Sequence, residues 1–119
     1  MEIIKIGLCR GRHNLPVEGY IFDEVVDVHD FTAMQEIADK YVRENCNVRE
    51  ITDDNGESRY VGGSLEIYVT GLTALTAAVM AACMWYGVAL TMYHYDRETA
   101  EYIPQNFREW RKDDRYYRA

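Results

Sequence analysis

Apolar and polar residues follow one another along the chain in short blocks that differ in their spacing. Residues 3–8, 65–69 and 88–95 form short apolar runs rich in β-branched or aromatic side chains, which is typical of buried strands. Residues 101–103 are expected to return as a hairpin strand. We expect Pro104 to stop that strand, because proline has no N–H to donate to a sheet.

Two longer blocks have a helical character. Residues 31–45 repeat apolar side chains at helical spacing after Asp30, whose carboxylate is a good acceptor at the start of a helix. After the joining loop at residues 70–73, the chain is apolar almost all round up to Gly87, a typical residue just beyond a helix end. Because such a helix has no polar face, we expect the sheet and a partner subunit to cover it.

The strongest unit is strand–helix–strand, from residue 65 to residue 95. A helical crossover between two such strands makes them parallel neighbours. The strand at residues 3–8 can join the same sheet through a long crossover that contains the first helix. We therefore predict a single α/β domain over residues 1–119: a small Rossmann-like domain with a mainly parallel sheet, two helices and a C-terminal hairpin or arm, in which residues 107–119 would form the arm.

The composition narrows the class of protein. A chain of 119 residues that is 48% hydrophobic and 13% aromatic can build one folded core, and oligomerisation would help to bury what is left over. A net charge of −7 argues against binding to nucleic acid polymers, which depends on many lysines and arginines. A small anion is still compatible, since a few arginines suffice to hold it.

The cysteines and the N-terminus indicate the compartment. Cys9, Cys46 and Cys83 are odd in number and far apart, so they form neither a disulfide framework nor a zinc motif. We recognise no signal peptide, and the apolar run at residues 72–90 is interpreted as a buried helix followed by a strand. We predict a cytoplasmic protein with no cofactor, no metal and no membrane partner.

In parallel sheets, ligands bind beyond the carboxyl ends of the strands, so three loops are expected to meet at one edge. The first loop is basic and suits phosphate or carboxylate groups. The second opens the second helix, where backbone N–H groups attract anions. The third follows the strand at residues 88–95. The candidate ligand-binding residues at these places are Arg10, Arg12, His13, Thr70, Gly71, Thr73, His94, Asp96 and Arg97.

Each candidate also has an ordinary structural explanation. Residues 70–73 (TGLT) carry one glycine, which is equally typical of a plain helix start. Alternation along the strand puts Tyr93 and Tyr95 on one face and His94 and Asp96 on the other. The tyrosines suit stacking on a purine ring, or simply reflect β propensity. His94 and Asp96 suggest an acid–base pair, although no nucleophile motif accompanies them.

Three blocks of the chain resemble a family of short proteins found in phages and prophages: CRGRHNLPVEGYIF, LEIYVTGLTALTAAV and LTMYHYDRETAEYIPQ. Together they cover most of the chain. Its size and layout are also similar to those of phage anti-Thoeris sponge proteins, which sequester cyclic ADP-ribose isomers and, in some cases, cyclic oligonucleotides. The strand–TGLT–helix unit is similar to the nucleotide-sensing half-Rossmann domains of CRISPR accessory proteins, in which a cyclic oligoadenylate sits across a dimer.

These resemblances imply an oligomeric binder that does not turn over its ligand. They imply aromatic and arginine side chains around that ligand, with Tyr86, Asp96 and the C-terminal Arg108 and Arg111 as candidates. The C-terminal arginines alternate with aromatic and acidic residues, so salt links within the chain explain them equally well.

Three functions fit the sequence. The first is a homo-oligomeric sponge that sequesters a small nucleotide-derived immune signal in the host cytoplasm. The second is a small phosphodiesterase of ring-nuclease type, with His13 or His94 as the acid–base residue. The third is an acidic inhibitor that binds a host protein. We expect the first, because the chain lacks a catalytic constellation and its apolar helix suits an oligomer interface.

Overall fold

The computed structural model describes residues 3–9, 19–23, 27–70 and 72–107. Over these residues the chain is mixed α/β, with a mainly parallel five-stranded sheet and two helices, which confirms the predicted class. In chain order the elements are β1 (Ile3–Cys9), β2 (Tyr20–Phe22), α1 (Phe31–Asn45), β3 (Arg49–Thr52), β4 (Ser58–Val61), β5 (Ser64–Tyr68), α2 (Thr73–Tyr86), β6 (Ala89–Asp96) and β7 (Glu101–Phe107).

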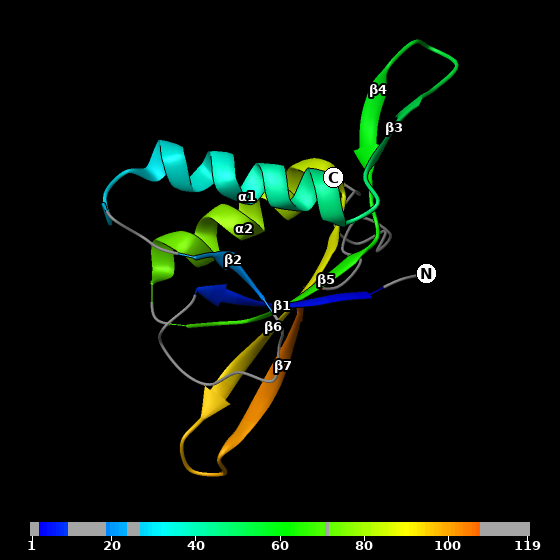
Figure 1. Cartoon of the computed structure of the whole chain (residues 1–119). Helices are drawn as coiled ribbons and strands as arrows, with labels where there is room; N and C mark the ends of the chain where they lie inside the picture. The colour runs from blue at the N-terminus through cyan, green and yellow to red at the C-terminus, as the bar shows by residue number, and fades with distance from the viewer. Residues whose placement is uncertain (1–2, 10–18, 24–26, 71, 108–119) are drawn as a thin grey trace, which may run out of the picture.

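The main sheet has the order β2-β1-β5-β6-β7, as Figure 1 shows. β1 pairs in parallel with β2 and with β5, and β5 pairs in parallel with β6. The predicted strand–helix–strand unit is therefore confirmed, and so is the parallel placement of β1 beside it. β7 returns antiparallel along β6 to close the sheet.

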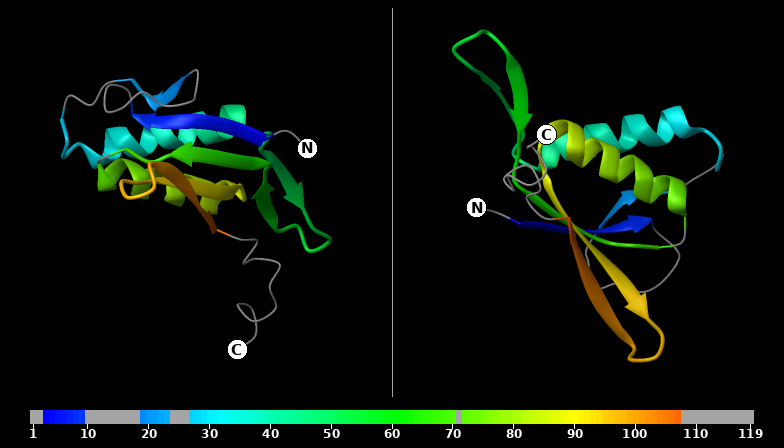
Figure 2. Two further views of the ribbon diagram at one scale, coloured as in Figure 1. Left: turned by 90° about the horizontal axis from the view of Figure 1, so that it is seen from below. Right: turned by 180° about the vertical axis from the view of Figure 1, so that it is seen from behind.

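α1 and α2 lie together on one face of this sheet (Figure 2). Leu65 and Ile67 of the central strand β5 are fully buried in the core with Leu75 and Val79 of α2. Among the described residues, no helix or strand covers the opposite face of the sheet. No helix in the described part of the chain is long and apolar enough to cross a membrane.

Both helices begin and end near the predicted residues. The Asp30 carboxylate accepts a hydrogen bond from the Ala33 amide at 3.1 Å, which caps the start of α1. Gly87 has the left-handed φ of 68° that ends α2, and its amide donates to the Cys83 carbonyl. α2 is buried on one side only, because Met84 and Trp85 are 59% and 71% exposed.

The prediction that Pro104 stops the last strand is wrong, since β7 continues through it to Phe107. Pro104 pairs with Tyr93, whose carbonyl accepts a hydrogen bond from Val69 on the other side of β6. The polar backbone atoms of Tyr93 thus point toward β5, and those of Pro104 point away from β6. Because β7 is an edge strand, proline fits here without removing a ladder hydrogen bond.

β3 and β4 form a separate antiparallel hairpin that projects from the body of the molecule (Figure 1). Its base is tied to the core by close backbone contacts. The Gly62 amide donates to the Gly87 carbonyl at 3.1 Å, and the Gly63 amide donates to the Cys46 carbonyl at 2.7 Å. At Gly62 a Cβ atom would lie only 2.6 Å from Val88 Cγ2, so this position requires glycine for space.

Candidate functional site

Half of the predicted ligand-binding residues are outside the described part of the chain, so their place at the sheet edge stays a prediction. The structure describes the strand ends from which the predicted loops leave. Because β1, β5 and β6 are parallel, these ends point to the same edge of the sheet. The predicted residues outside the described ranges are Arg10, Arg12, His13, Gly71, Arg108 and Arg111.

The loop before α2 has a structural role in the fold. Thr70 is only 2% exposed, and its hydroxyl donates to the Cys9 carbonyl at 3.4 Å. This contact links the ends of β1 and β5. Thr73 is exposed as the first residue of α2, after Leu72, whose side chain has no polar atom to cap the helix.

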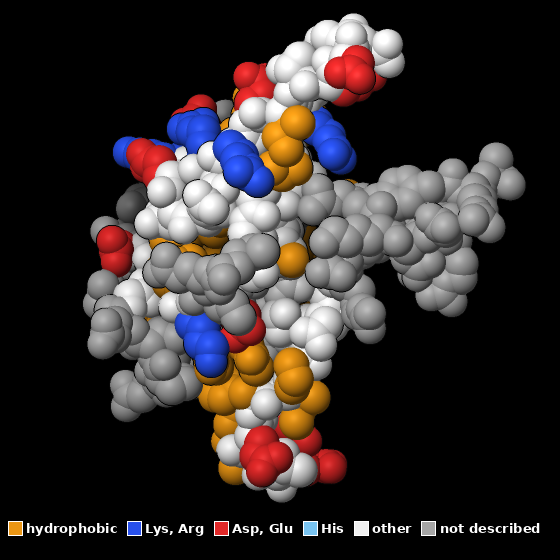
Figure 3. Space-filling model, turned by 90° about the vertical axis from the view of Figure 1, so that its right-hand side faces the viewer, with side chains coloured by type: hydrophobic (Ala, Val, Ile, Leu, Met, Phe, Trp, Pro, Cys, Tyr) orange, Lys and Arg blue, Asp and Glu red, His pale blue; other side chains and the backbone are white. Residues whose placement is uncertain are grey.

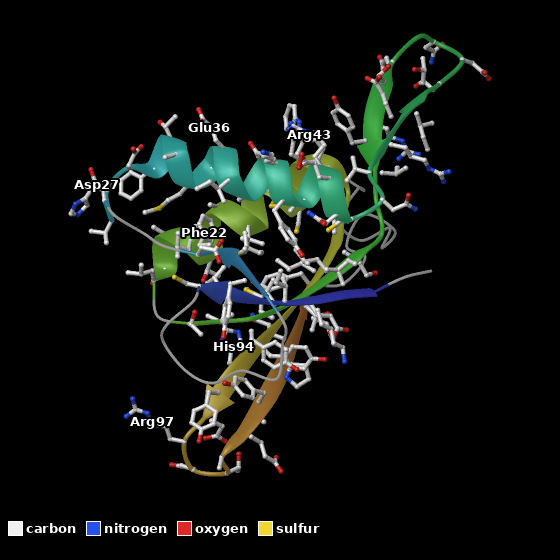
Figure 4. The ribbon with its side chains drawn as sticks, in the orientation of Figure 1. Phe22, Asp27, Glu36, Arg43, His94 and Arg97 are labelled. Carbon is white, nitrogen blue, oxygen red and sulfur yellow. The ribbon has the colours of Figure 1, made fainter. Side chains whose placement is uncertain are left out.

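β6 continues beyond the end of β5, so the last residues of β6 extend away from the sheet edge at which β1 and β5 end. Tyr93 pairs with Tyr68 at the end of β5, so residues 94–97 project with β7 as an arm (Figure 1). Figure 4 shows Arg97 at the far end of this hairpin, where it is exposed. The structure therefore does not place Arg97 beside Thr73.

His94 and Asp96 make separate contacts. His94 Nε2 lies 2.7 Å from the Gln105 side-chain oxygen. Asp96 accepts hydrogen bonds from the Glu98 amide at 3.0 Å and from the Thr99 hydroxyl at 3.1 Å. Both carboxylate oxygens of Asp96 thus hold the β6–β7 turn, and the acid–base pair considered from the sequence is not formed.

Tyr86 belongs to a different part of the molecule. It is 7% exposed at the C-terminal end of α2, and its hydroxyl oxygen accepts from Arg43 at 3.4 Å. Its ring meets the ring of Tyr60 from β4 edge-on, with centroids 5.0 Å apart. Thr73 is at the other end of the helix, about 20 Å away at 1.5 Å per residue. Tyr86 therefore braces the base of the β3–β4 hairpin.

Sequence reasoning missed a cluster of tyrosines on the sheet face opposite the helices. Among the described residues it comprises Tyr68, Tyr93, Tyr95 and Tyr102, and we name it the tyrosine face. Tyr68 and Tyr93 are stacked with ring centroids 4.8 Å apart and an interplanar angle of 15°. Tyr102 meets Tyr68 edge-on at 5.0 Å and lies 5.3 Å from Tyr95.

The cluster follows from the strand register. Tyr93 pairs with Tyr68 of β5, and Tyr95 pairs with Tyr102 of β7. The prediction that Tyr93 and Tyr95 share a face is confirmed, and this alternation was the sequence signal. Figure 3 shows hydrophobic side chains, a class that includes tyrosine, gathered on the β6–β7 hairpin above the acidic residues of its tip.

An ion pair between exposed Lys5 and half-buried Glu66 borders the tyrosine face. The Tyr93 hydroxyl donates to Glu66 Oε1 at 3.1 Å, and Lys5 Nζ lies 3.8 Å from the same oxygen. Desolvation and then the Glu66 hydrogen bond raise the pKa of Tyr93. Desolvation and the neighbouring tyrosines likewise raise the pKa of Tyr102. Both hydroxyls therefore stay neutral at physiological pH, and the rings present uncharged aromatic surface.

Cys46 and Cys83 offer no reactive thiolate. Both thiols are free and buried, and burial raises the pKa of Cys46 to about 11 and also raises that of Cys83. A protonated thiol is neither a nucleophile nor a metal ligand. Within the described ranges, no group of three His, Cys, Asp or Glu side chains is arranged to hold a metal ion.

The buried thiols predict a loss of stability at alkaline pH. The folded pKa of Cys46, about 11, lies above its ordinary value of 9.0, so the unfolded chain loses this proton first. The contribution of Cys46 to the free energy of unfolding is complete below pH 9 and is lost as the pH rises through about 11. Urea titrations across this window should show the decline. In a variant with Cys46→Ala and Cys83→Ala the slope should flatten, and an equally steep decline would contradict the assignment.

The comparison with known proteins adds no relative. Protein-family models, curated proteins and solved structures give no significant match to this chain. The resemblance to short phage and prophage proteins that the sequence predicts therefore stays a prediction.

Proposed function

We propose that this chain is a non-catalytic binder of a small nucleotide-derived ligand, and that the tyrosine face stacks on the base of that ligand. The observation that carries the proposal is the arrangement of Tyr68, Tyr93, Tyr95 and Tyr102 on the helix-free face. Base–aromatic stacking contributes about 1–3 kcal/mol per base and tolerates different bases. Tyr95 is 49% exposed and offers the most ring surface to a ligand.

The border of the tyrosine face supports an anionic ligand. Lys5 belongs to the same face, because it pairs in register with Glu66. Its side chain is 58% exposed, and its ammonium group lies 3.8 Å from the Glu66 carboxylate. A phosphate would replace that carboxylate as the partner of the ammonium group while a base stacks on the tyrosines. The proposal thus assigns the base and the phosphate to neighbouring parts of one face.

Binding without turnover is favoured over hydrolysis. Hydrolysis of a phosphodiester needs a positioned acid–base residue and charge stabilisation. Among the described residues, His94 contacts an amide oxygen, and both oxygens of the Asp96 carboxylate accept hydrogen bonds within the β6–β7 turn. His13, the other acid–base candidate, lies outside the described residues. The resemblance to phage sponge proteins extends the proposal to an immune signal, either a cyclic ADP-ribose isomer or a cyclic oligonucleotide, sequestered in the host cytoplasm. Parallel strands joined by helical crossovers support a Rossmann-like relationship for the sheet.

The first experiment is a thermal-shift panel of cyclic ADP-ribose isomers and cyclic oligonucleotides, followed by heat denaturation and analysis of the released ligand. A raised melting temperature with the ligand recovered intact is the expected result. Recovery of a cleaved product would replace the binder with an enzyme. No shift with any member would overturn the nucleotide proposal and favour an inhibitor of a host protein.

A matched pair of variants locates the binding face. Tyr95→Ala should weaken the affinity for the ligand found in the panel by roughly 5- to 150-fold, which corresponds to the loss of one stacking contact. Ile103→Ala is the control, because Ile103 is 46% exposed on the same hairpin but alternates to the opposite face. Isothermal titration calorimetry on both variants checks this. Equal affinities would move the site away from the tyrosine face.

A further inference from the structure

The outward side of α2 is apolar, which is unusual for a helix at the surface of an acidic protein. The segment 67–93 contains no Asp, Glu, Lys or Arg. A surface helix ordinarily turns charged residues toward solvent, as α1 does with Glu36 and Arg43 (Figure 4). The side chains that α2 exposes recur every three or four positions, and we name them the α2 stripe: Thr73, Ala77, Ala81, Met84 and Trp85.

The stripe has a hollow half and a protruding half. Beside its N-terminal half lies a groove of about 450 Å³ between α1 and α2. The groove is mostly apolar, and its lining residues are Phe31, Met34, Gln35, Ala74, Ala77, Ala78 and Ala81. At the C-terminal half, Met84 and Trp85 stand out at 59% and 71% exposure. One face of α2 therefore carries both protruding apolar side chains, Met84 and Trp85, and an apolar groove that could receive such side chains.

We infer that a second copy of this chain covers the α2 stripe, with the two α2 helices antiparallel about a two-fold axis near Ala81. Ala77 and Trp85 are each four residues from Ala81, so each lies about 6 Å from the axis along the helix, in opposite directions. Trp85 of each copy then lies beside Ala77 of the other, at the groove. The small residues Ala77 and Ala81 let the helices approach closely, and each copy fills the other's groove.

The area and the uncharged character of the stripe both permit a second copy as the occupant. Each chain has a net charge of −7, so two copies repel each other overall, but no like charges meet across the stripe, where apolar burial can offset that repulsion. At 59% and 71% exposure, Phe31 and Trp85 present on the order of 300 Å² in each copy. With Met84 and the alanines, two copies would bury roughly 1,000 Å² in total, which reaches the lower bound for a specific interface.

The dimer does not depend on the proposed ligand. Figure 2 shows α2 on one side of the sheet, and the strand register puts the tyrosines on the other side. Pairing through the α2 stripe therefore does not cover either tyrosine face with the second copy. Oligomeric state is measured without any nucleotide. A failure of the dimer and a failure of nucleotide binding are therefore separate results.

The test is light scattering and sedimentation of the full chain, for which we expect twice the 13.9 kDa mass of one copy. Trp85→Glu and Ala77→Arg should each weaken dimerisation roughly 30-fold or more, as expected for a central interface residue. The double variant should recover the dimer, because the antiparallel register puts the new carboxylate of one copy beside the new guanidinium of the other. Ile37→Glu is the control, since Ile37 is 43% exposed on α1 and does not line the groove.

A cross-link checks the axis without disturbing the packing. The native thiols are buried, so Ala81→Cys adds an accessible thiol near the proposed axis, and mild oxidation should give a disulfide-linked dimer. Ile37→Cys should remain unlinked. A wild-type chain that is monomeric at its highest soluble concentration would overturn the inference. The inference would also be overturned if Trp85→Glu and Ala77→Arg each left dimerisation unchanged. A disulfide-linked dimer formed by Ile37→Cys in place of Ala81→Cys would overturn it as well.

Discussion

The variant Ile67→Ala is expected to lower the free energy of unfolding by about 2–5 kcal/mol, the range for deleting a buried aliphatic side chain. Ile67 is fully buried on β5, the central strand of the main sheet. In register it lies between Ile6 of β1 and Met92 of β6, and the core beneath α2 covers it. With strands on both sides and helices above, the surroundings have little room to collapse into the cavity.

Urea denaturation followed by far-ultraviolet circular dichroism measures this loss. The control is Ile103→Ala, the same chemical change at a position that is 46% exposed on β7. Surface substitutions of this kind change stability by within about 0.5 kcal/mol. If the two variants lost equal stability, Ile67 would not lie at the centre of the core.

The variant Gly62→Ala should lower the free energy of unfolding by about 1–3 kcal/mol through overpacking. A Cβ atom at this position would lie 2.6 Å from Val88 Cγ2, 3.1 Å from the Cys46 carbonyl oxygen and 3.2 Å from Val48 Cγ2. Gly62 does not have a positive φ, so the cost arises from contact alone. The carbonyl belongs to the backbone and cannot rotate away, which is why relaxation is limited.

A double-mutant cycle with Val88→Ala tests the cause of that loss. Removing the closest methyl group should make Gly62→Ala less costly than it is in the wild-type background. Gly19→Ala is the matched control, because among the described residues its Cβ would meet only Ile6 Cδ1, at an ordinary 3.9 Å. Additive effects in the cycle would show that the Val88 contact does not limit this position.

Much of the fold could be predicted because its signals are local. Asp30 caps the helix that begins at the next residue by accepting from an amide three residues ahead, and Gly87 ends a helix by its own φ. The strands at the centre of the sheet are short, mostly apolar segments, and this pattern can be recognised without knowing which strands lie beside them. Pro104 was misjudged because its tolerance depends on which side of β7 pairs with β6, and that is a property of the assembled sheet.

The candidate site was harder to predict, because it depends on register and on competing contacts. Tyr93 and Tyr95 were recognised as sharing a face, but Tyr68 and Tyr102 join them only through pairing between strands. Asp96 was expected to contact a ligand, whereas the nearby Glu98 amide and the Thr99 hydroxyl, which fold back in the turn, occupy its oxygens. The apolar sequence of α2 predicts that the helix is buried. It does not predict which side of α2 packs on its own sheet and which side is left exposed.

The outward-pointing backbone of Pro104 has a consequence for solubility. A sheet ends safely only if its outer strands cannot recruit another strand from a neighbouring molecule, since such recruitment leads to aggregation. β7 is seven residues long and, without a proline, would present a regular row of donors. Pro104 removes the donor from the middle of that row, while β2, the other edge, spans only three residues. Both edge strands of the sheet are thereby protected against pairing with strands of other molecules, even though the tyrosine face exposes aromatic surface.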